Sequence, residues 1–258
     1  SSLGDAYLAL RQPDKALAVA DRAMLQIPSS SMLLNTRGLA LAASNRPEEA
    51  MAAYRAAMAA SAGSASPVTN LGLLLLQLGR REEGIAALKQ ALELQPAYVK
   101  AAKPLAYLEM EAGNLPAAAK LVFGYFQQFP GLSDARTLMA RYHISLALQA
   151  ARRQDNAGLE QACRQGLAIV PESAELMGFL GMNLLQQNRT EEALKLLQES
   201  YRLQPADPRV ALLLGELYIR LGRGPEARAV LDATLHEAKR RNDAAIAARV
   251  NQLLGQIP

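Results

Sequence analysis

Paired glutamates are the first residues of this sequence whose type and spacing could do chemistry. Adjacent carboxylates occur three times, at Glu48 and Glu49, Glu82 and Glu83, and Glu191 and Glu192. Two carboxylates share acid–base work only if both reach one substrate, and neighbouring helix positions point about 100° apart. Each pair also follows a turn residue, where negative charge favours a helix N-terminus. The pairs therefore predict helix starts rather than an active site.

Histidine and cysteine are too few and too scattered to predict a metal or nucleophile site. His143 and His236 lie far apart, without cysteine or carboxylate at ligand spacing. The single cysteine, Cys163, falls where a buried apolar group is expected, whereas a catalytic thiol needs an accessible, electropositive setting. The sequence has no phosphate-binding loop, nucleophile elbow or dinucleotide fingerprint. We therefore predict that the chain is not an enzyme and uses no metal or cofactor.

The segments that would position these residues recur with a period of 34. A small residue after a large apolar one occurs at Gly38, Gly72, Ala106, Ala147, Gly181 and Gly215. Successive members keep this period, except that the step from Ala106 to Ala147 is longer by seven. In most copies a proline follows at a fixed distance after the small residue, as Pro96 follows Gly72. A period of this length predicts stacked supersecondary units.

This pattern resembles the tetratricopeptide repeat, whose signature is L-G-x2-Y, then A-x3-F, then P. The chain has "LGDAY" near its start and "LGELY" followed by "ARAVLDATL" near its end, and seven copies cover nearly all of it. The resemblance implies an all-α fold, a right-handed α-solenoid of antiparallel helix pairs whose first helices line a concave groove. No pair can bury its apolar face alone, so neighbouring repeats must stack.

The predicted repeats form a single solenoid over 1–258, with ranges 1–30, 31–64, 65–98, 99–132, 133–173, 174–207 and 208–241 and a capping helix over 242–258. Ser1 matches the fifth position of a repeat, so the chain is expected to be part of something longer. The range 133–173 carries seven extra residues. Ser133 as an N-cap, with no breaker before Asn156, predicts one long helix over 133–154 that projects about two turns past its neighbours. Ala140 and Ala147 both fit the position where the two helices of the repeat cross, so the place of the insertion within the helix stays open. The insertion either has a function or is tolerated without one.

The resemblance implies which residues face the groove. Those predicted to bind a partner are Asn35, Asn70, Lys100, Lys103, Tyr107, Arg141, Arg152, Phe179, Met182 and Glu216. The basic members make the middle of the groove suited to a carboxylate or an acidic peptide. The apolar members predict a side-chain pocket, unless they belong to the core between repeats. Only Asn70 and Lys100 match the five-residue carboxylate clamp of chaperone adaptors, which disfavours chaperone-tail binding.

Composition limits the classes of partner that the chain could bind. A net charge of +4 and a pI of about 9.3 are too mild to predict nucleic-acid binding, and the longest apolar run, at 71–79, is too short to span a membrane. We predict a non-catalytic scaffold that binds an extended or helical segment of another protein. The alternative is a regulatory or substrate-recruiting domain of a larger enzyme, and self-association through the terminal helix is a third possibility. The repeats resemble bacterial arrays of envelope assembly, secretion and exopolysaccharide export, which favours the periplasm or cell envelope over the cytoplasm.

Overall fold

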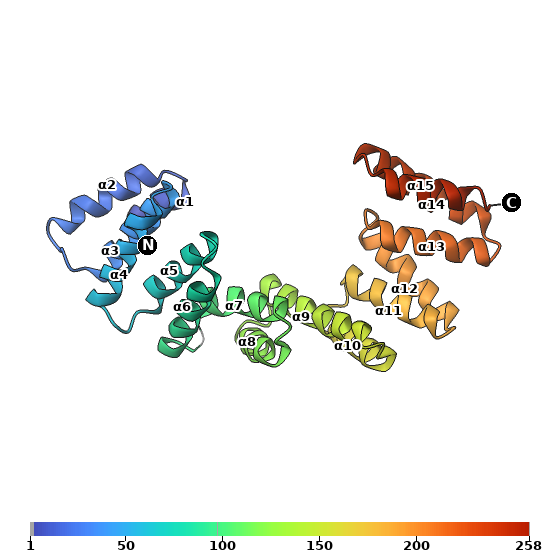
Figure 1. Ribbon diagram of the computed structural model, residues 1–258, viewed down its shortest axis with the longest axis horizontal. Coiled ribbons are helices and arrows are strands. Elements are labelled where there is room, and N and C mark those ends of the chain that lie inside the picture. The colour runs from blue at the N-terminus through green and yellow to red at the C-terminus, as the bar shows by residue number, and fades with distance from the viewer. Residues whose placement is uncertain (1–2, 97, 258) are drawn as a thin grey trace. The chain divides into compact units, whose positions relative to one another are not determined.

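The computed structural model describes residues 3–96 and 98–257. These residues form fifteen α-helices and no strand (Figure 1), as predicted for an all-α fold. The helices are α1 (Leu3–Ala9), α2 (Pro13–Met24), α3 (Ser31–Ala43), α4 (Pro47–Ala60), α5 (Ala65–Gln77), α6 (Arg81–Leu94), α7 (Val99–Glu111), α8 (Leu115–Gln128), α9 (Ser133–Arg152), α10 (Asn156–Ile169), α11 (Ala174–Gln186), α12 (Thr190–Leu203), α13 (Pro208–Arg220), α14 (Gly224–Arg240) and α15 (Ala244–Leu254). Ser1 lies outside the described residues. None of the described helices is both long and apolar enough to cross a membrane.

The chain divides into two compact units, residues 1–128 with α1 to α8 and residues 129–258 with α9 to α15. Consecutive helices pack as pairs, such as α3 with α4 and α11 with α12. The first helices of neighbouring pairs also touch, because α3 contacts α5 and α9 contacts α11. We call the side of these first helices that faces away from the second helices the first-helix surface of each unit. That one continuous solenoid spans 1–258 stays a prediction.

Small residues let the two helices of a pair cross closely, as the repeat pattern predicts. Gly72 on α5 faces Gly84 on α6. A Cβ on Gly84 would lie 2.6 Å from Cγ of Leu76 and 2.9 Å from the carbonyl oxygen of Gly72. In the preceding pair, a Cβ on Gly38 would lie 2.5 Å from the ring of Tyr54. Such approaches are closer than packed atoms tolerate, so the glycines set the spacing between the helices.

Each pair turns through a residue with positive φ, and this residue keeps the period of the repeat apart from the insertion before Gln154. The seven residues are Arg11, Asn45, Gly79, Gly113, Gln154, Asn188 and Gly222, with φ from 55° to 77°. This left-handed region suits glycine and asparagine, which explains their recurrence there. Gln154 follows Ala147 by seven positions, as Gly79 follows Gly72. Ala147 therefore takes the crossing position, and the extra seven residues precede it.

The predicted long helix is α9, which has 20 residues. Two details of that prediction are wrong. Ser133 is the first helical residue rather than the N-cap, since Leu132 precedes the helix and no side chain caps it. The added turns also do not project past their neighbours, because Ala135, Leu138 and Met139 are fully buried against other parts of the chain. Apolar side chains at helical spacing in the added turns account for this burial.

Candidate functional site

The second glutamate of a pair is held by an arginine at the start of its own helix. Arg46 binds Glu49 at 2.7 Å, and Arg80 binds Glu83 at 2.7 Å. Both arginines are N-cap residues, three positions before their partners. The hydrogen bond from Arg46 holds the pKa of Glu49 below its ordinary value. These ion pairs belong to the first turn of each helix, which confirms that the glutamates start helices.

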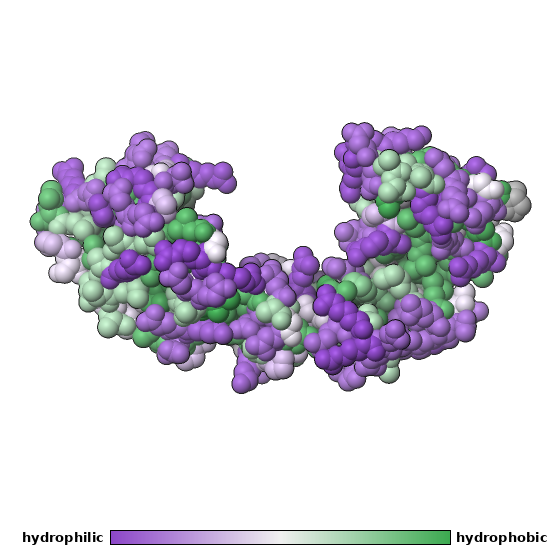
Figure 2. Space-filling view, viewed as in Figure 1, coloured by the Kyte–Doolittle hydropathy of each residue, from purple (hydrophilic) through white to green (hydrophobic). Residues whose placement is uncertain are grey.

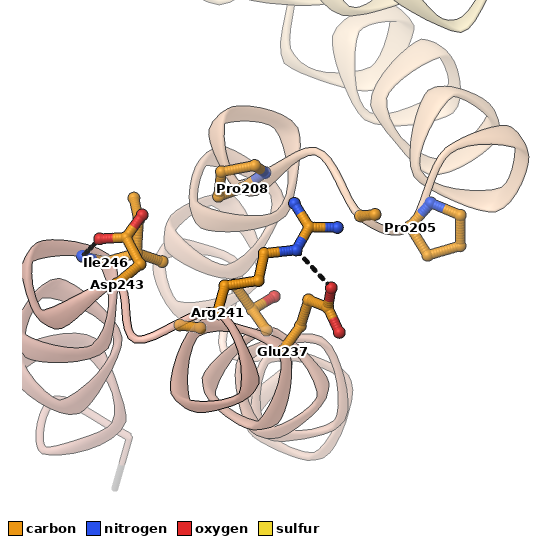
Figure 3. A pocket seen from close by; sticks show the side chains of 9 residues that line it. Pro205, Pro208, Glu237, Arg241, Asp243 and Ile246 are labelled. Atoms are coloured by element: carbon orange, nitrogen blue, oxygen red, sulfur yellow. Dashed lines mark hydrogen bonds and ion pairs between the residues drawn. The ribbon is translucent and has the colours of Figure 1, made fainter.

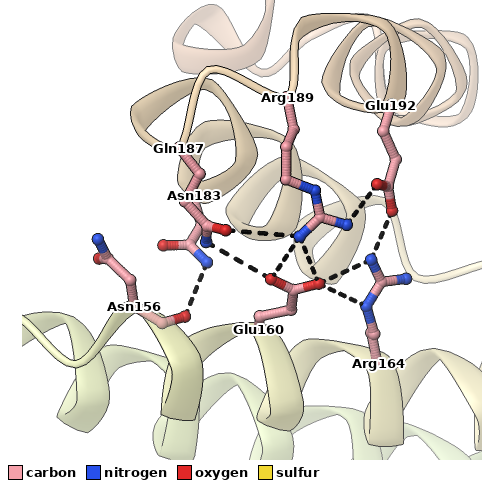
Figure 4. A network of polar contacts seen from close by, with 7 residues as sticks. All are labelled: Asn156, Glu160, Arg164, Asn183, Gln187, Arg189 and Glu192. Carbon is pink, nitrogen blue, oxygen red and sulfur yellow. Dashed lines mark hydrogen bonds and ion pairs between the residues drawn. The ribbon is translucent and has the colours of Figure 1, made fainter.

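In the third pair, Glu192 belongs to a larger ion-pair network between α10 and the start of α12 (Figure 4), and Glu191 lies beside it in the first turn of α12. Arg189 donates to both oxygens of Glu160 at 2.9 Å and to Glu192 at 2.5 Å, and Arg164 also donates to Glu192 at 2.5 Å. Burial raises the pKa of Glu160, but the hydrogen bonds from Arg164 and Arg189 outweigh it and hold that pKa below its usual value. Two guanidinium groups thus neutralise two carboxylates. The network joins neighbouring helix pairs and offers no free acid or base.

His143 and Cys163 are both buried in the second unit. Burial lowers the pKa of His143 against a weaker opposite effect of the Ala162 backbone, and neither ring nitrogen has a well-formed hydrogen bond within the described chain. Burial, together with the charge of Glu160, raises the pKa of the Cys163 thiol to about 12, far from that of a nucleophile. His236 is exposed. No group of three potential metal ligands occurs among the described residues.

A hollow opens on the first-helix surface of the first unit. Polar side chains cover most of the visible surface of each unit, and smaller apolar patches interrupt it (Figure 2). The hollow has a volume of about 310 Å³ and is lined by Leu39, Ala42, Ala43, Tyr54, Asn70, Leu73, Leu74 and Gln77. At its edge Asn70 Nδ2 donates to Asn35 Oδ1 at 2.8 Å. Two predicted groove residues therefore meet across α3 and α5.

The second unit has a larger pocket of about 530 Å³. Its lining residues come from the end of α9, the turn after it, the start of α10 and α11, and are Ala151, Gln154, Asn156, Leu159, Phe179, Met182, Asn183 and Gln186. Phe179 packs against the buried core, yet it and Met182 are only half-buried. Two of the three apolar residues predicted for a side-chain pocket, Phe179 and Met182, thus lie in one, and Phe179 also belongs to the packing between repeats. The third, Tyr107, lies on α7 of the first unit and does not line this pocket.

The two pockets are built from the same repeat positions. Four residues of the first pocket match four of the second in order, Asn70, Leu73, Leu74 and Gln77 with Phe179, Met182, Asn183 and Gln186. The two sets are separated by three repeat periods and the insertion of seven. The polarity differs at two positions, because Phe179 replaces an asparagine and Asn183 replaces a leucine. Asn183 was not predicted as a site residue, and the equivalent residues of the other repeats vary between alanine, leucine and glutamine.

The predicted basic residues are divided between the two units. Lys100, Lys103 and Tyr107 lie on α7 of the first unit, and Arg141 and Arg152 on α9 of the second. Lys103 and Tyr107 are half-buried. The other three are exposed, and none of the three makes an ion pair with a described residue. Each unit therefore presents cations of its own to solvent.

Glu216, the last predicted groove residue, is bound within the second unit. Its carboxylate on α13 forms an ion pair with Arg249 on α15. The same final helix contacts α13 and α14 and buries Val250 and Leu253. The α15 helix thus covers the end of the array, and Glu216 contributes to that joint.

A smaller hollow lies between the α12–α13 connection and the α14–α15 turn (Figure 3). Arg241 binds Glu237 at 2.5 Å there, and Asp243 accepts a hydrogen bond from the backbone of Ile246 at 3.0 Å. Hydrogen bonds from Arg240 and then Arg241 lower the pKa of Glu237 to about 2. The hollow has a volume of about 40 Å³, much smaller than the pocket that Phe179 lines.

Comparison with known families decides what this helical array is. Two tetratricopeptide repeat models match the chain, one over residues 75–142 and 184–253 and the other over residues 2–65. The chain belongs to the tetratricopeptide repeat family. No curated protein matches this TPR chain at a significant level.

Solved TPR structures resemble the chain over most of its length. The C-terminal part of a TPR repeat-containing protein from Cytophaga hutchinsonii is 10% identical, with a TM-score of 0.59 over 98% of this chain and 93% of that one. The pilF protein of Pseudomonas aeruginosa is 14% identical, with a TM-score of 0.57 over 92% and 98%. YrrB, a TPR protein with an unusual peptide-binding site, is 16% identical, with a TM-score of 0.50 over 77% and 97%. At these identities the likeness shows the fold alone.

Proposed function

We propose that this TPR protein is a non-catalytic scaffold that binds an extended or helical segment of a partner protein on its first-helix surface. The 530 Å³ pocket of the second unit carries the proposal, because Phe179 and Met182 reach it while only half-buried. A pocket that combines apolar side chains with a few polar groups suits an anchor side chain, which supplies most of the binding energy of such contacts. The peptide-binding site named for YrrB, which shares the fold, supports the same use.

The partner segment is expected to carry acidic residues beside its anchor. Arg152 directly follows Ala151, which lines the pocket, and Arg141 lies on the same helix. Both arginines are exposed and have no ion-pair partner among the described residues. Lys100 is an equally exposed cation in the first unit. Such cations attract an anionic segment and speed its association more than they tighten it.

The repeats resemble bacterial arrays of envelope assembly, secretion and exopolysaccharide export. This resemblance supports the proposal that the scaffold works in one of these systems. A second copy of the chain is another candidate source of the bound segment, with α15 as that segment. Light scattering at rising protein concentration tests self-association, since a constant mass would exclude it.

Short random peptides displayed on phage test the proposed function directly. Met182→Glu places a carboxylate beside Phe179 in the pocket and should weaken binding of the selected peptides about tenfold or more, as measured by fluorescence anisotropy. Arg141→Glu with Arg152→Glu should weaken acidic peptides and flatten the salt dependence of binding. The matched control reverses two exposed cations on second helices of the same unit, Lys195→Glu with Arg228→Glu, and should change neither. Wild-type binding by folded Met182→Glu would show that peptides use another surface.

A further inference from the structure

Apolar side chains continue beyond the pocket of the second unit, along its first-helix surface. Leu148 on α9 occupies the repeat position of Met182 on α11, and Leu213 on α13 occupies that of Phe179. Leu148 is 40% exposed and the other three side chains are half-buried. Both leucines lie outside the set of side chains that line the pocket. We call these four side chains the apolar strip.

The apolar strip crosses three helices that lie side by side. The α9 helix contacts α11. Val210 on α13 packs against α11, since its side chain would lie 3.1 Å from a Cβ on Gly178. Helices in contact have axes about 8–10 Å apart, so the strip spans about 16–20 Å from α9 to α13. A segment that covers the whole strip must therefore lie across the three helices.

One edge of the apolar strip is basic. Its three residues share one repeat position, each is the last residue of its helix, and they are Arg152, Gln186 and Arg220. Both arginines are exposed, and neither makes an ion pair with a described residue. Gln186 also lines the pocket, so this basic edge borders it. Two guanidinium groups are thus available to the carboxylates of a partner.

The opposite edge has no excess of positive charge. Its residues also share one repeat position and are Arg141, Glu175 and Arg209. Glu175 on α11 lies between the two arginines, and Arg209 is bound by Asp207 at 2.8 Å. Two positive charges therefore meet two negative charges at this edge. Acidic groups of a partner are favoured on the basic edge only.

The width of the apolar strip suits a helix better than an extended chain. Leu148 and Met182 form one row, and Phe179 and Leu213 form a second row about one helical turn earlier. An amphipathic helix presents an apolar stripe about 100° wide, whose residues alternate between two such rows. An extended chain directs every second side chain along a single line.

The polar side chains within the two rows are already engaged. The hydroxyl of Ser145 donates to the carbonyl oxygen of Arg141 at 3.0 Å, and Glu216 is bound by Arg249. An exposed amide of the pocket, that of Gln186, lies along the basic edge instead. An extended segment on the strip would need hydrogen bonds for its backbone, whereas a helix makes these bonds internally.

We propose that the second unit binds an acidic amphipathic helix of a partner protein, which lies across α9, α11 and α13 with its apolar stripe on the strip and its carboxylates beside Arg152 and Arg220. This inference rests on the proposed function and adds the conformation of the bound segment and the side that carries its charge. Helix residues seven positions apart are separated by about 10.5 Å, close to the spacing of neighbouring first helices. One apolar residue therefore enters the pocket while the next meets Leu148 or Leu213. The α15 helix of a second copy is not this segment, because it contains no acidic residue.

Random peptides of about 18 residues, displayed on phage and selected on the whole chain, test this inference, because a helix of that length spans about 27 Å and can cross the strip. The selected sequences should repeat apolar residues at intervals of three or four, with aspartate or glutamate along one side of the helix. A proline in place of a polar residue at the centre of a selected peptide should weaken binding about tenfold or more, because it breaks the helix. This exchange needs no variant of the protein.

Leu148→Ser distinguishes a helix on the strip from a single anchor in the pocket. Leu148 lies outside the pocket, so its loss should weaken the selected peptides about tenfold only if the segment reaches along the strip. Leu203→Ser is the matched control, because Leu203 on the second helix α12 is 36% exposed, and it should leave binding unchanged. Arg220→Glu should weaken acidic peptides, and Arg228→Glu, at an exposed position of α14, should not.

The outcomes separate this inference from the proposed function. Binding that is lost in Met182→Glu but persists with the central proline, or persists in full in Leu148→Ser, would overturn the helix and leave the proposed function standing. Peptides that bind folded Met182→Glu as well as the wild type, or a library that yields no binder, would overturn both. Equal losses in Leu148→Ser and Leu203→Ser would also overturn the inference, because binding would then not depend on the strip.

Discussion

Two glycine-to-alanine changes in the first unit measure how rigidly the helices of a pair cross. Gly84 lies in α6 at the crossing, where an added Cβ would meet Leu76 Cγ at 2.6 Å and the carbonyl oxygen of Gly72 at 2.9 Å. Gly124 lies inside α8, where an added Cβ would meet no heavy atom within 4 Å. Both substitutions gain the same intrinsic helix propensity. The difference between their effects on the free energy of unfolding therefore measures the cost of an added Cβ at the helix crossing.

The expected magnitudes follow from these contacts. Alanine is favoured over glycine inside a helix by about 1 kcal/mol, so Gly124→Ala should stabilise the chain by up to that amount. At Gly84 the same gain is opposed by overpacking, which costs about 1–3 kcal/mol. The upper part of that range applies, because the carbonyl of Gly72 belongs to a helix backbone and cannot rotate away. Gly84→Ala should therefore destabilise the chain by about 1–2 kcal/mol, roughly 2–3 kcal/mol away from Gly124→Ala.

Urea unfolding followed by far-ultraviolet circular dichroism measures both variants against the wild type. The midpoint should rise for Gly124→Ala and fall for Gly84→Ala, with similar slopes. A rise of equal size for both would refute the reasoning, because the helix pair would then relax around the new methyl group without cost.

Two further predictions concern buried titratable groups of the second unit. The pKa of His143 lies below its ordinary value of 6.5 in the folded chain, so the unfolded chain takes up the proton first as the pH falls. The free energy of unfolding should therefore be unaffected by His143 above pH 6.5 and should decline as the pH falls below that value. His143→Phe should reduce this loss of stability, measured by thermal unfolding between neutral and mildly acidic pH. His236→Gln, at an exposed position, should leave the loss unchanged. If His143→Phe loses stability as the wild type does, other groups cause the loss. Cys163 is 0% exposed and its thiol pKa is raised to about 12. It should react with a thiol reagent far more slowly in the native chain than in urea, and a native rate near that of free cysteine would contradict its burial.

Several features of the fold were predictable from sequence because their causes repeat locally. Each crossing needs a small residue, as at Gly72, and each turn favours a residue that tolerates positive φ, as at Gly79. Both constraints act between residues close in the chain, so they recur with the period. The glutamates at helix starts, such as Glu49, were predictable for the same reason. The limit appears at α9, where two alanines fit the crossing and only the turn at Gln154 showed that Ala147 takes it.

The candidate site was predictable only in part. The repeat pattern placed Phe179 and Met182 on a first helix, because helical spacing determines which side chains share a face. Whether they border a pocket depends on side chains from α9 and α10, far away in sequence. The same holds for Glu216, whose partner Arg249 lies on another helix.

What the sequence by itself determined is the repeat and its fold class, since these follow from periodic patterns of residue type. Only the tertiary structure decided that Asn183 borders a pocket and that its buried Oδ1 accepts no hydrogen bond from a described residue. The composition of the repeat shows the asparagine but not the state of its hydrogen bonds. That state depends on the distance and direction to the carbonyl of Asn156 on a neighbouring helix, which no local pattern encodes.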